Sequence, residues 1–452
     1  MPAAGKAATA ATVLLADTRH RKLRPWIEWS CTLMLVFAIY RMSPIISSGD
    51  SHFVIPTALS ILNHGDPKID DYSALFSDAQ WAVVYSHGHF YNTYPIGVAL
   101  IVLPAVCVWD GVKALSRIDL EAAAMVKADL ALELTLASLL TAVAVSLFFC
   151  YCRRRLSLAR SALLTFLFAF GTSAYSSASR GMWQHGPSML LFLASILVFD
   201  RLEATGWKSV WACILLGFLT AFSFSVRPSN LIVIASLGIL TLIKKGTYFL
   251  AFLVGAAIGL APMIYFDLSI FGTILSPYYQ MTMGGATQPF HWRPFLGLLI
   301  SPSRGVLIFS PFLAVVVLRF WPSVLKKHPI SKLEIVLAAL VLIWIYGTAK
   351  FPNWWGGGSY GPRLLCETFP CLLVLLIPLA KDASFKAGMP QKALAAAFLV
   401  LGGVSVAIHF RGATSEDVWR WNGVPVGIDH DPERAWAWHN IQFLSGLAKH
   451  RR

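Results

Sequence analysis

The sequence predicts an all-α polytopic membrane protein, built as a bundle of about eleven transmembrane helices. Of its 452 residues, 56% are hydrophobic and only 13% are charged, whereas about a quarter of the residues in a soluble domain are charged. The apolar residues form repeated runs of about 15 to 25 residues, close to the length that crosses a bilayer. Short basic loops separate many of these runs, as in the cytoplasmic loops of membrane proteins.

The charge and the cysteines exclude several other classes of protein. The net charge of +14 would suit nucleic acid, but the basic residues lie between apolar runs and form no stripe or nucleic-acid motif. We therefore expect no nucleic-acid partner. The seven cysteines lie in or at the ends of apolar segments, and none has the spacing of a loop disulfide or a zinc cluster. We expect no metal and no cofactor.

The N-terminal segment 1–25 is expected to be cytoplasmic. Its short apolar stretch Ala11–Ala16 precedes the basic run Arg19–Arg24, which is the reverse of the order in a signal peptide, so no cleavage is expected. The basic run flanks a first span at Trp26–Ile46 and places the N-terminus inside. The further spans are predicted near Asp129–Tyr151, Ser161–Ser179, Gly186–Asp200, Trp207–Val226, Ser229–Ile243, Gly246–Phe266, Gly305–Phe320, Leu333–Gly347, Leu364–Ala380 and Ala393–Phe410.

The apolar stretch Tyr94–Trp109 decides the topology. If it crossed the bilayer, the clusters Arg153–Arg160 and Lys244–Lys245 would lie outside, against the preference of Lys and Arg for cytoplasmic loops. If it forms a juxtamembrane helix at the outer interface, every strongly basic loop lies inside, and its two prolines fit that role. We therefore expect eleven spans, a transmembrane domain 26–410 whose structured first outer loop covers 47–127, and an extracytoplasmic C-terminal tail 411–452.

Asp50 follows the first span in the segment Ser48–His52. A carboxylate at the outer mouth of a helix bundle is partly desolvated and can accept a proton. The alternative is that Asp50 caps the helix that follows. Asp70 and Asp71 are expected to face water or to cap the next turn.

The end of this loop contains His87 and His89 among tyrosines. Two histidines at this spacing could ligate a metal ion only on an extended segment, and no third ligand has a suitable spacing. We favour contacts with lipid headgroups or a sugar.

Four isolated arginines lie at the predicted outer ends of spans, against the charge rule. A guanidinium inside the membrane is costly, so each marks a functional site unless it reaches the headgroups. Arginine forks also suit phosphate oxygens. These arginines are Arg180, Arg227, Arg304 and Arg363.

The segment Phe351–Arg363 contains two tryptophans, a run of glycines and a tyrosine before its arginine. Glycines permit tight turns and close backbone approach, and indole rings offer apolar faces to a sugar or a lipid. The alternative is an interfacial tryptophan belt on a turn. The glycine run lacks the Lys-Ser/Thr and the preceding strand of a phosphate loop.

Together these motifs resemble the GT-C superfamily of integral membrane glycosyltransferases, which use polyprenyl-phosphate sugars. The matching pieces are Gly49–Asp50, His87–Tyr94 before Pro95, Ser301–Val306 with Ser310–Pro311, and Trp354–Arg363. The last two of these four pieces look like those of bacterial phospholipid carrier-dependent glycosyltransferases. The resemblance implies a GT-C-like bundle with its active site away from the cytoplasm and Asp50 as the catalytic carboxylate. Many relatives carry a second acidic residue beside it, where this chain has Ser51, so that Asp70 or Asp71 would be the substitutes for a paired carboxylate.

We therefore predict a glycosyltransferase of the inner membrane, transferring a hexose or pentose from a polyprenyl monophosphate carrier to an acceptor hydroxyl on the extracytoplasmic side. The acceptor would be a glycan, a lipid or a protein, and membrane lipids surround the bundle. Asp50 would act as general base. The residues predicted to bind the phosphate or the substrate are Arg363 and Arg304 first, then Arg180 and His185, with Tyr360, His87, His89 and Trp355.

Two alternatives remain open. A flippase or other transporter of lipid-linked saccharides would also need outer arginines, although such proteins often show internal repeats and polar residues along a midplane path. An O-antigen ligase or polymerase would be a membrane transferase that uses diphosphate carriers.

Overall fold

The computed structural model describes residues 25–47, 49–78, 80–116, 122–284, 288–382 and 389–447. Nearly all of the predicted segment 1–25 lies outside these residues. The described chain is mostly helical, with one two-stranded sheet. The first predicted span coincides with a helix over residues 25–42.

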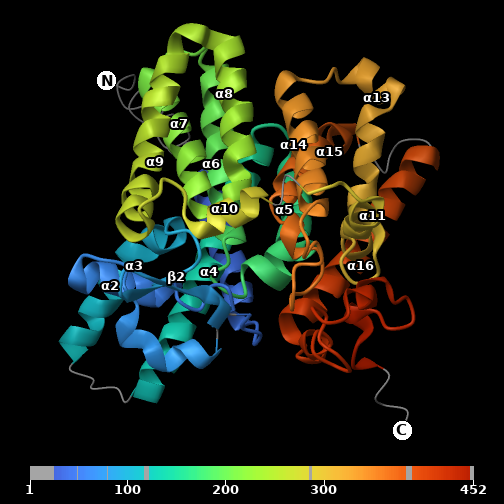
Figure 1. The fold of residues 1–452 in the computed structure, drawn as a ribbon. Coiled ribbons are helices and arrows are strands. Elements are labelled where there is room, and N and C mark those ends of the chain that lie inside the picture. Colours follow the sequence, from blue (N-terminus) through green and yellow to red (C-terminus); the bar gives the residue numbers. More distant parts are fainter. Residues whose placement is uncertain are drawn as a thin grey trace, which may run out of the picture.

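Long helices form two neighbouring groups (Figure 1). One group contains α6 (His185–Ala204), α7 (Val210–Val226), α8 (Leu231–Lys245) and α9 (Phe249–Phe271), packed beside α4 (Ala122–Arg153). The other contains α14 (Lys332–Ala349), α15 (Thr368–Asp382), α16 (Met389–Thr414) and the shorter α5 (Leu158–Phe170). Every predicted span therefore contains a helical segment.

The predicted eleven spans are supported only in part. Within the described residues, four helical stretches are long and apolar enough to cross a membrane. They are Leu130–Arg153, Pro228–Phe271, Lys332–Ala349 and Lys392–Thr414, and four shorter apolar helices accompany them. The stretch Pro228–Phe271 contains two helices, because the backbone leaves helical geometry at Lys245 and α9 runs back beside α8 (Figure 1).

The segment predicted as a span at Gly305–Phe320 is broken. It forms a short helix α12 (Val306–Phe309) and a 3₁₀ segment η7 (Pro311–Phe320). The break falls at Ser310, because Pro311 has no amide hydrogen to continue the ladder. A 3₁₀ segment is longer per residue than an α-helix, so ten residues extend about 20 Å.

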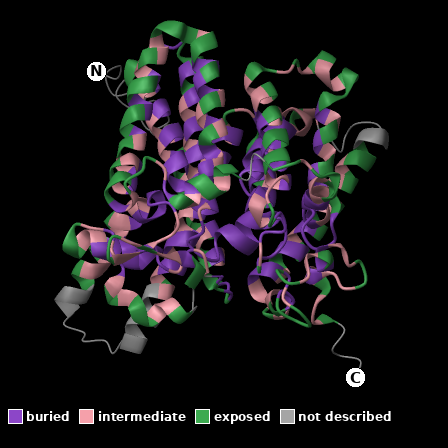
Figure 2. Ribbon diagram, in the orientation of Figure 1, coloured by how far each residue is buried: buried purple, intermediate pink, exposed green. Residues whose placement is uncertain are grey.

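Exposed residues lie along the outer sides of the helices (Figure 2), and many of them are large and apolar. On α9, for example, Leu250 is 70% exposed and Tyr265 is 68% exposed. Exposed apolar surface of this kind is unfavourable in water and favourable in lipid. The chain is therefore a membrane protein.

Glycines bring α7 and α9 into close contact. A Cβ atom on Gly255 would lie 1.9 Å from Ile214 O, and one on Gly217 would lie 1.9 Å from Phe252 O. Gly259, four residues after Gly255, also packs against the backbone of α7. This small-xxx-small arrangement is the usual way in which membrane helices approach closely.

The first loop folds against the lower end of α7 and α9 in Figure 1. It contains α2 (Val54–His64), the 3₁₀ segment η1 (Asp70–Asp78), the strands β1 (Val83–Ser86) and β2 (His89–Asn92), and α3 (Gly97–Ser116). The strands form a hairpin whose two turn residues, His87 and Gly88, both have positive φ, as type I′ turns require. α3 contains most of the predicted juxtamembrane stretch Tyr94–Trp109, from Gly97 onward.

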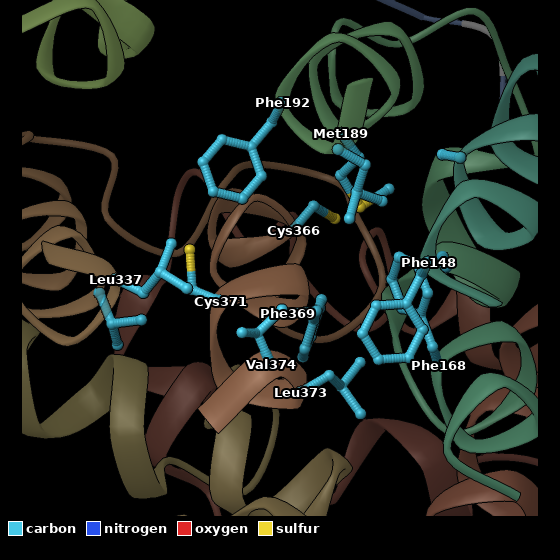
Figure 3. Close-up of a cluster of buried hydrophobic side chains, with 14 of the residues drawn as sticks. Phe148, Phe168, Met189, Phe192, Leu337, Cys366, Phe369, Cys371, Leu373 and Val374 are labelled. Atoms are coloured by element: carbon cyan, nitrogen blue, oxygen red, sulfur yellow. The ribbon is translucent and has the colours of Figure 1, made fainter. Parts of the chain in front are cut away.

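The centre of the second group is α15, most of which is buried. Figure 3 shows its side chains between Phe148 and Phe168 on one side and Leu337 of α14 on the other. Because burial of this kind fixes the helix, the residues just before Thr368 are held in a defined place. Two of them, Arg363 and Glu367, contribute to the site described next.

The C-terminal tail is folded. It contains α17 (Asp417–Arg420) and two short 3₁₀ segments, η9 (Pro432–Trp436) and η10 (Gln442–Leu444). Figure 1 places it at the same end of the helices as the first loop, whereas the α8–α9 connection with its two lysines lies at the opposite end.

Candidate functional site

A cavity of about 940 Å³ lies where the first loop, the helices and the C-terminal tail meet. Its lining comes from seven parts of the chain: the turn after the first helix, the end of the first loop, the loop before α6, Arg227, the start of α10 (Pro277–Gly284), the glycine turn and the C-terminal tail. The polar and aromatic residues that line it are Asp50, Ser51, Trp81, Tyr94, Trp183, Gln184, His185, Arg227, Tyr278, Asn353, Arg363, Trp419 and Asp429. The volume is in the range of small-molecule sites.

Asp50 faces this cavity. Its Oδ1 accepts a hydrogen bond from Trp81 Nε1 at 3.2 Å, and its Oδ2 lies 3.2 Å from Arg363 Nη1. The alternative that Asp50 caps the next helix is wrong, because α2 begins after Phe53 with no side-chain cap. The turn at residues 49–52 instead presents the carboxylate, 30% exposed, to the cavity.

Arg363 is held from three sides. Its Nη2 donates to Gly356 O at 3.0 Å, and its guanidinium lies 3.9 Å from the centre of the Trp183 ring. Its Nε is buried and, among the described residues, has no hydrogen-bond partner. The glycine turn is required here, because Gly356 and Gly357 have φ of +75° and +62°, which L side chains rarely adopt. The guanidinium is therefore fixed in position, while one of its N–H groups has no acceptor among the described residues.

Trp183 lies on a loop that Arg180 fastens to the first helix. The guanidinium of Arg180 donates to the backbone oxygens of Tyr40 and Ser43, and Arg180 O accepts from Ser47 N at 2.7 Å. Trp183 Nε1 donates to Ser47 Oγ at 2.9 Å. Arg180 is fully buried and does not line the cavity. Arg180 therefore holds this loop against the first helix and does not make the phosphate contact that was predicted for it.

Arg304 is also committed to the backbone. Its guanidinium donates to five acceptors, three of them backbone oxygens. It is 1% exposed and lies outside the cavity lining. The prediction that Arg304 binds the donor phosphate does not fit these contacts. Its partners Gln442 and Asn422 belong to the C-terminal tail, so Arg304 attaches the tail to the glycine turn.

Two cavity residues share one buried carboxylate. Arg227 Nη1 donates to Glu367 Oε1 at 2.6 Å, and His185 Nδ1 lies 3.0 Å from the same oxygen. Arg227 Nη1 also contacts His185 Nδ1. Glu367 is 2% exposed and lies behind the cavity wall. With Nδ1 turned to Glu367, the nitrogen of His185 left for a ligand is Nε2.

The other predicted contacts lie away from the cavity. The Tyr360 side chain is fully buried, and its hydroxyl donates to Ile408 O at 2.7 Å. Trp355 is 9% exposed, and its Nε1 donates to Asp429 Oδ1 at 2.8 Å. His87 Nδ1 lies 2.9 Å from Ile270 O at the end of α9. His87 therefore fastens the hairpin to the bundle.

His89 pairs with Asp70 instead of facing the cavity. His89 Nδ1 lies 2.9 Å from Asp70 Oδ2, and Phe90 N donates to Asp70 Oδ1 at 3.0 Å. Burial alone would raise the pKa of Asp70, but these hydrogen bonds outweigh it and hold the pKa below its usual value. Asp70 therefore stabilises the fold of the first loop and does not replace the missing acidic neighbour of Asp50.

Ser51 has a buried acidic partner. Its Oγ donates to Glu133 Oε1 of α4 at 2.6 Å, and the same oxygen accepts from Met182 N at 2.8 Å. Glu133 thus joins the turn that carries Asp50 to the loop that carries Trp183.

The residues that the sequence analysis missed are Glu367, Trp183, Trp81 and Asp429. Glu367 is an acidic residue inside a predicted span, which is itself a signal of function. Across the described parts of the chain, no group of three His, Cys, Asp or Glu side chains is placed to hold a metal ion. No family model and no curated protein matches this chain.

Proposed function

We propose that this protein is a membrane glycosyltransferase that moves a sugar from a polyprenyl monophosphate carrier to an acceptor hydroxyl. The observation that carries the proposal is the pairing of Asp50 with Arg363 in a large cavity. The Asp50 carboxylate can accept a proton, and the Arg363 guanidinium can bind a phosphate. The end of the bundle that holds this cavity lies opposite the basic α8–α9 connection, which supports an extracytoplasmic site in the inner membrane.

In the proposed reaction the acceptor oxygen attacks the anomeric carbon. Its proton passes to the Asp50 carboxylate, the new glycosidic bond forms, and the bond from the anomeric carbon to the phosphate oxygen breaks. The electron pair leaves with the polyprenyl phosphate, whose negative charge Arg363 stabilises. A hydrogen-bond donor that is already positioned where negative charge develops lowers the free energy of the transition state by several kcal/mol. A single displacement of this kind inverts the anomeric configuration.

The contacts of Arg363 also suggest how the donor enters. The Asp50–Arg363 pair is a single contact at 3.2 Å, and the side chain of Asp50 is 30% exposed. A phosphate that approaches Arg363 from the cavity would compete with Asp50 for the same guanidinium. Donor binding would thereby release the carboxylate to act as base. Arg227, whose carboxylate partner is fully buried, would stay in place and add positive charge to the wall.

The test uses the full chain in lipid nanodiscs supplied with polyprenyl monophosphate sugars and a mixture of hydroxyl acceptors. The released polyprenyl phosphate is measured. Asp50→Asn is expected to abolish release while carrier binding persists. Asp71→Asn is the matched control, because that carboxylate lies in the same loop and is 76% exposed.

Retained release by Asp50→Asn would remove Asp50 as the base. Release that occurs only from diphosphate carriers would favour a ligase or polymerase. Movement of the intact carrier between leaflets, without release, would favour a flippase.

A further inference from the structure

The C-terminal tail forms one wall of the cavity. From the tail, Trp419 and Asp429 line it. The tail is held in place by Gln442, whose side chain donates to Ser359 O and Val418 O and accepts from Arg304. Because these contacts are buried, the wall is a fixed part of the site.

Asp429 is oriented by an indole. Its Oδ1 accepts from Trp355 Nε1 at 2.8 Å, while among the described residues its Oδ2 has no hydrogen-bond partner. The carboxylate lies over the glycine turn, since a Cβ atom on Gly357 would lie 3.7 Å from Oδ1 and 3.8 Å from Oδ2. Any side chain at Gly357 would therefore approach the carboxylate. Asp429 therefore lines the cavity with one carboxylate oxygen that Trp355 does not engage.

The glycine turn contacts both Arg363 and Asp429. Arg363 contacts Asp50 through Nη1 and Gly356 O through Nη2, and the next residue, Gly357, faces Asp429. The arginines Arg363 and Arg227 supply positive charge to the lining, whereas the tail supplies an indole and a carboxylate.

The chemistry of the tail region suits a sugar ring and not a phosphate. A free carboxylate oxygen accepts hydrogen bonds from hydroxyl groups and repels a phosphate. Trp419 provides an indole whose apolar face can pack on the C–H face of a pyranose. Its Nε1 is already bonded to Gly412 O at 2.8 Å, so the ring is fixed before any ligand arrives. Asn353, also in the lining, adds an amide that can donate and accept.

We propose that Asp429, Trp419 and Asn353 form the acceptor subsite, and that the acceptor is a saccharide whose ring hydroxyls bind Asp429. This inference rests on the proposed transferase function and specifies its acceptor class. It also gives the tail a role in recognition. The attacking hydroxyl would lie toward Asp50, across the glycine turn from the hydroxyls that Asp429 binds.

The test measures saccharide binding without catalysis. Fluorescent nanodiscs that contain the full chain are applied to an array of immobilised mono- to tetrasaccharides. The wild type is expected to bind a restricted set, and Asp429→Asn is expected to reduce that binding at least tenfold. Asp431→Asn is the matched control, since this nearby carboxylate does not line the cavity. Carrier binding, measured by native mass spectrometry with undecaprenyl monophosphate, should be unchanged in Asp429→Asn.

Two results would overturn the assignment: no bound saccharide, or equal binding by the wild type and Asp429→Asn. Loss of carrier binding in Asp429→Asn would also overturn it, because the region would then serve the donor. Asp50→Asn separates this inference from the proposed function. That variant should still bind the saccharide, and if it also kept full transfer, the catalytic proposal would fail while the subsite remained.

Discussion

The buried pair between Arg227 and Glu367 leads to a quantitative prediction for Glu367→Gln. The facing atoms are 2.6 Å apart, and the side chains are 13% and 2% exposed. At an effective dielectric constant of about 20, unit charges at this distance attract by about 6 kcal/mol. A glutamine side chain can still accept the hydrogen bond from Arg227 but leaves its charge uncompensated. We therefore expect Glu367→Gln to lower the free energy of unfolding by about 3 kcal/mol.

The chain offers a matched control in Glu334→Gln. Glu334 pairs with Arg319 at 2.8 Å, Arg319 is fully buried, and neither residue lines the cavity. Equilibrium unfolding in mixed micelles should give a similar loss for both variants. Binding of undecaprenyl monophosphate, followed by native mass spectrometry, should strengthen only in Glu367→Gln, because the uncompensated Arg227 in the cavity lining attracts the phosphate. A loss below about 1 kcal/mol in Glu367→Gln would refute the energetic argument, and equal binding in both variants would refute the role of this pair in the cavity.

Other features of the structure give three further expected outcomes. Gly255→Leu should cost about 3 kcal/mol or prevent folding, because even a Cβ atom there would meet a backbone oxygen of α7 at 1.9 Å, whereas Gly403→Leu enters open space and should unfold like the wild type. Arg304→Ala should make the C-terminal tail more sensitive to limited proteolysis, because it leaves buried oxygens without a donor, while Arg420→Ala removes only an exposed ion pair and should change little. The pKa of Asp70 is lower in the folded protein than in the unfolded chain, so this carboxylate stabilises the fold at any pH above its unfolded-state pKa. The stabilisation is lost as the pH falls through the folded-state pKa of Asp70. Asp70→Asn should therefore flatten the dependence of the thermal unfolding temperature on pH below about pH 4.

Apolar runs in the sequence located the long helices, but they did not reveal short helices such as α10 (Pro277–Gly284), α11 (Trp292–Ile300) and α13 (Pro322–Lys327), nor separate helices that cross a membrane from shorter ones. Pro311 is visible in the sequence, yet the 3₁₀ geometry that follows it depends on packing. The glycine contacts of α7 and α9 were also not predicted, because a glycine in an apolar run looks the same whether it meets lipid or a backbone oxygen.

Of the isolated charged residues that the sequence analysis selected, some line the cavity and others do not. Isolated charge directed attention to Asp50 and Arg363, which the structure brings together. The same signal selected Arg304 and Arg180, whose donors are taken by backbone oxygens. The sequence cannot separate these cases, because the acceptors come from distant segments. Glu367 carried a signal in the sequence, since it is acidic and lies inside a predicted span, but its partners, 140 and 182 residues away, could not be predicted.

The pairing of Asp50 with Arg363 has a consequence for biosynthesis. The two residues are separated by 313 positions, and the wall that carries Asp429 is made later still. Ribosomes deliver a chain from its N-terminus, and early segments fold first. The cavity can therefore exist only after almost every helix has been inserted and the tail has docked. A partly synthesised chain would hold Asp50 at the membrane surface without the guanidinium that pairs with it.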